Sequence, residues 1–271
     1  MEFEILSGKE RGKNGNLCDL LKASIDRGDS FFSEKQLMMD MSTKAHYFTE
    51  WKMNFWMHFM LRDGFFWQHY IALEDGQDIK LTKDAPGRII EEFISEDNQL
   101  ICHPKSFFAA ESQIKPVFYN LLNIHYQKRR GDTLRRLFFA SGIDFAFYDF
   151  QGQGKVFVDS DGDYTKIELE KGERRIVDPD YIIMFSKNMK VRLKSPNEIG
   201  PEDEKFLRDH EVYSRAMRGR RWDLGNYILN GIFKMEFEGP GTVYRDTISE
   251  HPEEGGNIFS GIKDIIASRV Q

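Results

Sequence analysis

YTKIELEKGERRIVDPDYII, residues 164–183, decides the fold, because it reads as a strand, a tight turn and a second strand. In its first part, the apolar Ile167 and Leu169 alternate with charged residues. Such alternation with a period of two indicates a strand with one face in the core and the other in water. Gly172 then provides the backbone freedom that a tight turn needs. The segment therefore predicts antiparallel β structure.

Two earlier segments repeat this pattern, LLKASIDRGDSFFSEKQLMM (20–39) and IIEEFISEDNQLICHPKSFF (89–108). When their turns are aligned with the turn of 164–183, apolar residues recur at the same places before and after it in all three copies. Glycine and aspartate both tolerate the left-handed conformation of a tight connection. The aligned turn residues are Gly28, Asp97 and Gly172.

A second unit also occurs three times, as YIALEDGQDIKL (70–81), YDFQGQGKVFV (148–158) and MEFEGPGTVY (235–244). Each copy has an apolar residue, a glycine turn and then a branched apolar residue. A phosphate-binding loop needs a helix directly after its glycines, whereas here a strand follows. The pattern therefore predicts β-hairpins, with Gly76, Gly154 and Gly241 in the turns.

The two units divide the chain into three β-rich modules. Repeats that cannot bury a face alone normally close on each other, so we expect one mainly β domain over residues 1–250 with a compact, pseudo-threefold arrangement. The charged and aromatic segments between the units predict helical connectors, and the C-terminal tail is expected to be helical. The modules span about 1–83, 84–158 and 159–248, the connectors about 49–63, 115–139 and 200–229, and the tail 251–271.

Several segments resemble the AIM24 family. LEKGERRIVDPDYIIMF and FEGPGTVY resemble its signature segments, and PGRIIEEFISEDNQLICHPKSFFAA resembles its middle module. The resemblance implies a TRAP-like, double-stranded β-helix fold that is often oligomeric, and it implies no catalytic residue. The mitochondrial branch of the family is associated with inner-membrane organisation. Because no presequence is evident, this chain is more similar to the prokaryotic, largely uncharacterised members, and a cytoplasmic location, with peripheral membrane contact, is expected.

Composition disfavours several classes of function. The formal net charge of −6 argues against a general nucleic-acid coat. The two cysteines, Cys18 and Cys102, match neither a disulfide framework nor a zinc site. None of the histidines forms an H-x-H or H-x₃-H pair, which a cupin-like metal enzyme would use. No apolar run approaches the ~20 residues of a membrane-spanning helix.

The loop DSDGDYTKIELE (159–170) offers one candidate cation site. Asp159, Asp161 and Asp163 fall at the first, third and fifth positions of a calcium loop, and Glu170 at the twelfth. Tyr164, however, takes the sixth position, where the loop requires glycine. A turn between two strands is the favoured interpretation, and no cofactor or metal is predicted.

These observations predict a non-enzymatic β-rich scaffold or binding protein. The alternatives are a ring-forming nucleic-acid binder of the TRAP type and, less favoured, a cupin-like metal enzyme. The first would need exposed aromatic side chains beside basic ones for base stacking. The second would be revealed by stoichiometric metal in the purified protein.

Two basic segments interrupt the acidic background, YQKRRGDTLRRL (126–137) and YSRAMRGRRW (213–222). Arginine binds phosphate through two hydrogen bonds at once, so we hypothesise an anion-binding surface for anionic lipid headgroups or a partner protein. The alternative is a pair of solvated helix faces. The hypothesis involves Arg129, Arg130, Arg135, Arg136, Arg218, Arg220 and Arg221.

Aromatic residues on both faces of one strand predict self-association. A monomer rarely leaves such a patch uncovered, so we expect a homo-oligomer, with a trimer as one candidate. The residues behind this expectation are Phe145, Phe147, Tyr148, Phe150, Phe233, Met235 and Phe237.

Overall fold

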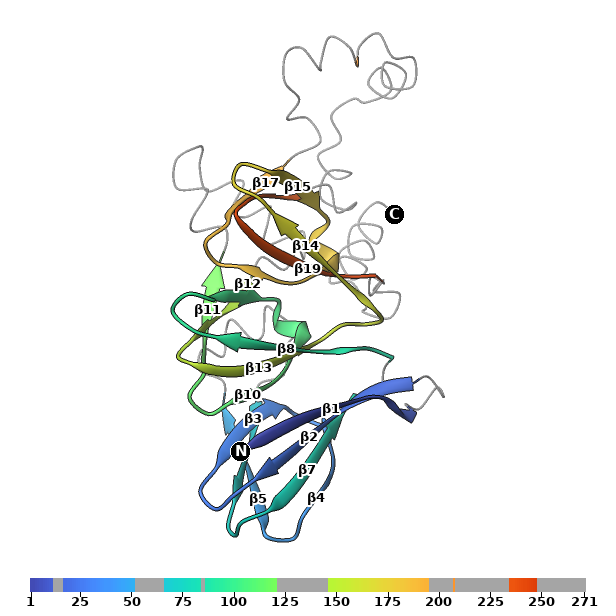
Figure 1. The fold of residues 1–271 in the computed structure, drawn as a ribbon, viewed down its shortest axis with the longest axis vertical. Helices are drawn as coiled ribbons and strands as arrows, with labels where there is room; N and C mark the ends of the chain where they lie inside the picture. The colour runs from blue at the N-terminus through green and yellow to red at the C-terminus, as the bar shows by residue number, and fades with distance from the viewer. Residues whose placement is uncertain are drawn as a thin grey trace, which may run out of the picture.

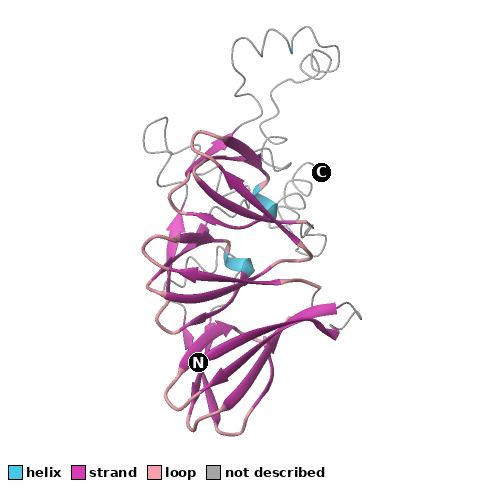
Figure 2. Cartoon of the chain, in the orientation of Figure 1, coloured by secondary structure: helices cyan, strands magenta, loops and turns pink. Residues whose placement is uncertain are grey.

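The computed structural model describes residues 1–11, 17–51, 66–83, 86–120, 146–194, 207 and 234–247. In these residues the chain is mainly β, as predicted; two short 3₁₀ helices lie between strands, and Leu207 is helical (Figure 2). Within the same ranges, no helix has the length and apolar character needed to cross a membrane.

The strands fall into three groups that follow the sequence modules. The first group is β1 (Glu2–Arg11), β2 (Leu17–Ile25), β3 (Ser30–Glu34), β4 (Met38–Met41), β5 (Ala45–Trp51), β6 (Phe66–Ala72) and β7 (Gln77–Thr82). The second is β8 (Ile89–Ile94), β9 (Leu100–Cys102), η1 (Pro104–Ser106), β10 (Phe107–Glu111), β11 (Lys115–Asn120), β12 (Ala146–Gln151) and β13 (Gly154–Asp159). The third is β14 (Tyr164–Leu169), β15 (Arg174–Val177), η2 (Pro179–Tyr181), β16 (Ile182–Ser186), β17 (Lys190–Lys194), β18 (Lys234–Glu238) and β19 (Gly241–Asp246).

These strands form four antiparallel sheets, which we name A to D. Sheet A has the order β1-β2-β7-β4, and sheet D has the order β15-β18-β17. The two inner sheets are each shared by two modules: sheet B runs β5-β6-β3-β10-β13-β8, and sheet C runs β11-β12-β9-β16-β19-β14. The modules are therefore joined by two strand pairs, β3 with β10 and β9 with β16.

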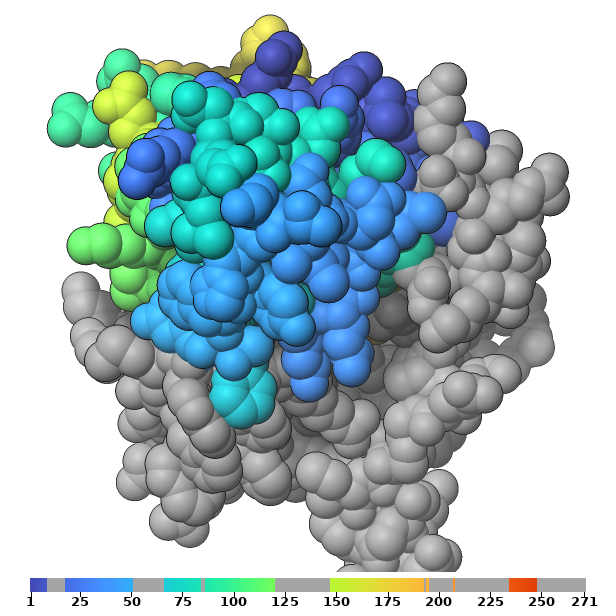
Figure 3. Space-filling view, turned by 90° about the horizontal axis from the view of Figure 1, so that it is seen from below, coloured from blue at the N-terminus to red at the C-terminus, as the bar shows by residue number. Residues whose placement is uncertain are grey.

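The modules follow one another along the long axis of the molecule (Figure 1). Sheet A lies towards one end and sheet D at the other, and no strand pair among the described residues joins them. Figure 3 looks at the first end, which is covered by residues of β4, β5 and the β6–β7 region. This open stack differs from the closed, pseudo-threefold arrangement that the repeats predicted, because each module completes its second sheet with the next module and so extends the pairing in one direction.

The three glycine turns at 76, 153 and 240 do not form β-hairpins, so that interpretation was wrong. β6 pairs with β3 and β5, whereas β7 pairs with β2 and β4, and the same separation holds for β12 and β13 and for β18 and β19. Each turn therefore carries the chain from one sheet to the next. Gly76, with φ of 68°, shows the left-handed backbone that makes this sharp corner accessible to glycine.

The other three aligned turns also connect different sheets, but not by one conformation. Gly28 and Gly172 have φ of 88° and 83°, and a Cβ there would meet nothing within 4 Å, so backbone conformation is what favours glycine. Asp97 has no left-handed backbone. Its turn is held by Asn98, whose Nδ2 donates to the carbonyl of Phe93 at 2.7 Å.

Sheet C lies between two parts of the hydrophobic core. Phe147 on β12 packs in one cluster, whereas Tyr148 and Phe150 pack in the other. Met235 and Phe237 on β18 are also buried. These aromatic and apolar faces are therefore covered by sheets of the same chain, which removes the reason for expecting another subunit over them; Phe145 and Phe233 lie outside the described residues.

Two predicted helical connectors begin as strands. Residues 49–51 belong to β5, and residues 115–120 form β11. Aromatic and β-branched residues such as Val117, Phe118 and Tyr119 suit a pleated surface, which explains the error. The remainder of the connectors, apart from Leu207, and the tail at 251–271 lie outside the described residues.

Candidate functional site

A buried ionic cluster ties the first module to the loop between the second and third. Lys83, directly after β7, places its Nζ 2.5 Å from Asp159 Oδ2 and 3.0 Å from Asp161 Oδ1. Asp159 is buried at the end of β13. Burial lowers the pKa of Lys83, but the charges of Asp159 and Asp161 outweigh it, so the net effect raises this pKa and keeps the ammonium charged.

The last strand of the third module joins the same cluster. The backbone N–H of Asp161 donates to Asp246 Oδ1 at 3.0 Å. Burial, with the nearby charge of Asp161, raises the pKa of Asp246 to about 7. Burial also raises the pKa of Asp159 to about 6, although Lys83 acts in the opposite direction. Chain segments from all three modules thus meet at one lysine and three carboxylates.

The candidate calcium loop is part of this cluster. Asp159 and Asp161 both bind the ammonium of Lys83, so a lysine occupies the place between the first two carboxylates of the loop. Asp163 instead accepts a hydrogen bond from the backbone N–H of Tyr164, which begins strand β14. Within the described ranges, no group of three or more histidine, cysteine, aspartate or glutamate side chains is arranged to hold a metal ion.

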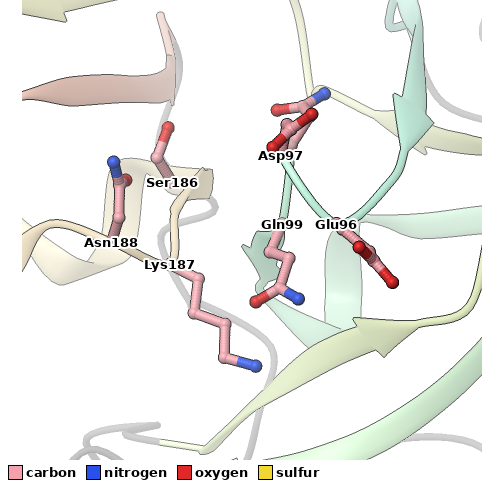
Figure 4. Close-up of a pocket in the computed structure, with 7 residues that line it drawn as sticks. Glu96, Asp97, Gln99, Ser186, Lys187 and Asn188 are labelled. Atoms are coloured by element: carbon pink, nitrogen blue, oxygen red, sulfur yellow. The ribbon is translucent and has the colours of Figure 1, made fainter.

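A polar pocket of about 210 Å³ lies between the β8–β9 turn and the β16–β17 turn, which face each other in Figure 4. Lys187 reaches from it to Asp149 Oδ2 at 2.8 Å. Asp149 is buried on β12, and its Oδ1 has no hydrogen-bond partner among the described residues. The pocket offers one ammonium and several carboxamide and carboxylate groups, which suits hydrogen bonding to a small polar group. It is lined by Glu96, Asp97, Asn98, Gln99, Ser186, Lys187 and Asn188.

The outer face of sheet D carries rows of charged side chains. Glu238 on the central strand β18 binds Arg174 and Lys190, each at 2.7 Å, and the hydrogen bond from Lys190, together with that from Arg174, lowers the pKa of Glu238. In the next row, Arg192 binds the buried Glu236 at 2.7 Å. The basic residues of this face are Arg174, Lys190, Arg192, Lys194 and Lys234, against the acidic Glu236 and Glu238.

This basic face was not predicted from the sequence, although the sequence contains a signal for it. KVRLK, residues 190–194, places three basic residues at alternate positions, which in a strand point to the same side. The seven arginines of the sequence hypothesis, Arg129, Arg130, Arg135, Arg136, Arg218, Arg220 and Arg221, lie outside the described residues. The two basic regions therefore come from different segments of the chain.

Comparisons with known proteins agree with the resemblance found in the sequence. The crystal structure of protein SPYM3_0169 from Streptococcus pyogenes matches 98% of this chain and 100% of its own, with a TM-score of 0.57 and 14% sequence identity, which supports a shared fold alone. The search of curated proteins finds no match. The sequence model described as "Mitochondrial biogenesis AIM24" matches residues 13–248. The chain therefore belongs to the AIM24 family.

Proposed function

We propose that this protein is a non-catalytic β scaffold that attaches to an anionic lipid surface through the outer face of sheet D. The observation that carries the proposal is the excess of five basic over two acidic side chains on that face, in a chain whose net charge is −6. Asp178, which pairs with Lys234 beside the face, offsets one of the positive charges. A surplus of cations remains on this face, where Arg174, Lys190 and Arg192 are each more than half exposed.

The side chains of this face favour a lipid surface over a nucleic acid. Its three strands present long basic side chains, with Lys190 80% exposed and Arg174 58% exposed. Among the described residues of the face there is no aromatic side chain on which a base would stack. Each basic residue close to an anionic membrane contributes on the order of 1 kcal/mol, so a few suffice for reversible attachment.

The buried charges support the scaffold part of the proposal. Lys83, Asp159 and Asp246 hold segments of different modules together, and Asp19 accepts hydrogen bonds from the backbone of Gly8 and Ile89 at 3.0 Å each. These charged groups therefore bind other segments of the same chain and help to hold the modules together. A TRAP-like nucleic-acid binder and a metal enzyme are the competing functions. RNA binding and metal content distinguish them from the proposed scaffold.

Sedimentation with lipid vesicles tests the proposal. The protein should pellet with vesicles that contain anionic lipid, and raising the salt concentration or omitting the anionic lipid should release it. Replacing Lys190 and Lys234 by glutamine should weaken binding about fivefold for each residue. The matched control replaces Lys22 and Lys80 by glutamine on sheet A, which changes the net charge equally at the other end and should leave binding unchanged.

Three results would overturn the proposal. Binding that is equal for both double variants would assign it elsewhere on the chain. Tighter binding to RNA than to vesicles would favour the nucleic-acid alternative. Stoichiometric zinc, iron or manganese in the purified protein would favour the metal enzyme.

Self-association stays a prediction and is part of this proposal, although those of the residues suggesting it that the structure describes are buried inside the chain. Static light scattering decides it, since a mass of 31.8 kDa at all concentrations would mean a monomer.

A further inference from the structure

The two strand pairs that join the modules have the same register. At the first junction Ala110 lies opposite Phe32, and at the second Phe185 lies opposite Ile101. Ala109 and Met184, one position earlier, lie opposite Ser33 and Cys102. Successive modules of the chain are therefore joined twice by strand pairs of the same register.

Both ends of the stack present the strands that would make a third junction of this kind. When the modules are aligned at Gly28, Asp97 and Gly172, strand β4 corresponds to β10 and β16, and strand β15 corresponds to β3 and β9. Among the described residues, β4 pairs only with β7 and β15 only with β18, so each has an open edge. An open strand edge presents unpaired backbone N–H and C=O groups to a partner strand.

Exposed apolar side chains also indicate that each end of the stack lacks a neighbouring module. Ile176 on β15 is 49% exposed, whereas its counterparts Phe32 and Ile101 are buried by the following module. At the other end, Met39 on β4 is also 49% exposed, whereas its counterparts Phe108 and Ile183 are buried. These apolar residues lie where the internal junctions bury apolar side chains, so a neighbour of the same construction would cover them.

We propose that a second copy of this chain docks head to tail, with β4 of one copy pairing antiparallel with β15 of the other. The register of the internal junctions then places Met41 opposite Ile176, Asp40 opposite Val177 and Ser42 opposite Arg175. This inference does not rest on the proposed lipid binding, although both involve the outer face of sheet D, where Arg174 and Ile176 of β15 lie opposite Glu238 and Glu236. A second copy of the chain would thus cover the open edge of β4 and the open edge of β15.

Charge complementarity supports this partner. Arg175 is exposed on β15, and Asp40 is exposed on β4. In the proposed register these two lie diagonally across the new pair, within reach of each other. Over whole sheets, the strands of sheet D carry six basic and two acidic residues, whereas those of sheet A carry four basic and six acidic residues. Opposite ends of two copies therefore attract each other.

The contact between copies is weaker than the junctions within the chain. Phe157 and Tyr244 lie opposite Ala109 and Met184 in sheets B and C, whereas the corresponding pair in sheet A is Lys80 with Asp40. Docking partly desolvates this ion pair, so the association is reversible and depends on salt. Because the contact is heterologous, copies either close into a ring or extend into a chain.

Two blocked variants test the proposal in one experiment. The first carries Arg175→Glu and Ile176→Glu on β15, and the second carries Met39→Lys and Asp40→Lys on β4. Each variant alone is expected to be a monomer, with the association weakened about tenfold or more by the reversed charges. Mixed in equal amounts, the two should form a one-to-one dimer, because each retains the edge that the other lacks. Light scattering measures the masses.

A disulfide cross-link tests the register. Chains with Met41→Cys and chains with Ile176→Cys should become linked on oxidation only when they are mixed, and the native Cys18 and Cys102 are buried and should not interfere. Phe93→Cys, at a similarly exposed apolar position on β8, is the control and should not link to Met41→Cys. A wild-type protein that stays monomeric at high concentration, or blocked variants that do not dimerise when mixed, would overturn the proposal.

Discussion

The outer face of sheet A presents Glu2, Glu4, Asp40 and Asp78 with only Lys22 and Lys80, whereas the outer face of sheet D presents five basic side chains with Glu236 and Glu238. Both ends are charged where the inner sheets B and C bury apolar residues on both sides. Terminal repeats of stacked proteins need such a polar outer face for solubility. The opposite signs add a direction to the stack, because among the described residues acidic side chains prevail on one outer face and basic side chains on the other.

The position of Lys80 shows how an end differs from the middle. Its counterpart in sheet B is Phe157, which is fully buried against the core of the preceding module. We expect Phe157→Ala to lower the free energy of unfolding by about 3–5 kcal/mol, because it leaves a cavity between two modules. Lys80→Ala should change it by less than about 1 kcal/mol, since it removes only an exposed ion pair.

Urea denaturation of both variants measures this difference. If Phe157→Ala does not fold, the milder Phe157→Leu should still lower the stability clearly more than Lys80→Ala does. Equal effects at the two positions would show that the inner and terminal sheets are supported in the same way, which would break the comparison.

The two ends should also differ in the cost of losing a charge. Arg192 donates two hydrogen bonds to Glu236 Oε2, at 3.0 and 2.7 Å, and that carboxylate is buried. We expect Arg192→Gln to destabilise the protein by about 2 kcal/mol, since the buried carboxylate loses its charged donor. The control is Lys80→Gln, whose partner Asp40 is about half exposed and remains solvated. A smaller loss for Arg192→Gln than for Lys80→Gln in thermal unfolding would contradict this account.

The buried cluster between the modules should make stability depend on pH. The folded protein raises the pKa of Asp246 to about 7 and that of Asp159 to about 6, from 3.8 for an ordinary aspartate. The folded state therefore keeps protons that the unfolded state has released, so this contribution to stability is present below about pH 4 and is lost as the pH rises through 6 and 7.

Asp246→Asn isolates this effect. The asparagine oxygen still accepts the hydrogen bond from Asp161, but it carries no charge, so the variant should be about 1–2 kcal/mol more stable than the wild type above pH 7 and similar to it near pH 4. Asp163→Asn changes an exposed carboxylate of the same loop and is the control. Denaturant unfolding at several pH values compares them; a wild-type advantage at high pH would disprove the assignment.

The repeat could be predicted from the sequence because its signals are local. Alternation such as that of Ile167 and Leu169 reports one strand, and the aligned turn at Gly172 reports its connection, so the mainly β class and the family followed. The partner of each strand is not local information. Nothing in the glycine turn at 240 states that β18 and β19 lie in different sheets, and hairpins were therefore predicted in place of corners between sheets.

The sequence singled out Asp159 and Asp161, but their partner Lys83 was missed for the same reason. Lys83 is separated from Asp159 by a whole module, so only the fold reveals that the two meet. The basic face of sheet D was within reach of the sequence, because Lys190, Arg192 and Lys194 alternate. The arginine-rich connectors drew attention instead, since a run of charges is more conspicuous than an alternation shared by three strands.

The smallest expected effect concerns a pair of isoleucines at equivalent positions. Ile101 on β9 and Ile176 on β15 follow their turns at the same distance, yet Ile101 is fully buried and Ile176 is 49% exposed. Ile101→Ala should lower the free energy of unfolding by about 2–5 kcal/mol, because it leaves a cavity in the core cluster that contains Phe147 and Phe237. Ile176→Ala should change the stability of a dilute, monomeric sample by less than about 0.5 kcal/mol, because water already contacts the side chain.

At high concentration, however, the proposed docking buries Ile176 against Met41 of another copy. The melting temperature of the wild type should then rise with protein concentration, and that of Ile176→Ala should rise less. An effect of Ile176→Ala that is large in dilute solution would mean that the end of the stack is closed by its own chain, and the difference between the two isoleucines would then have to be explained without a second copy.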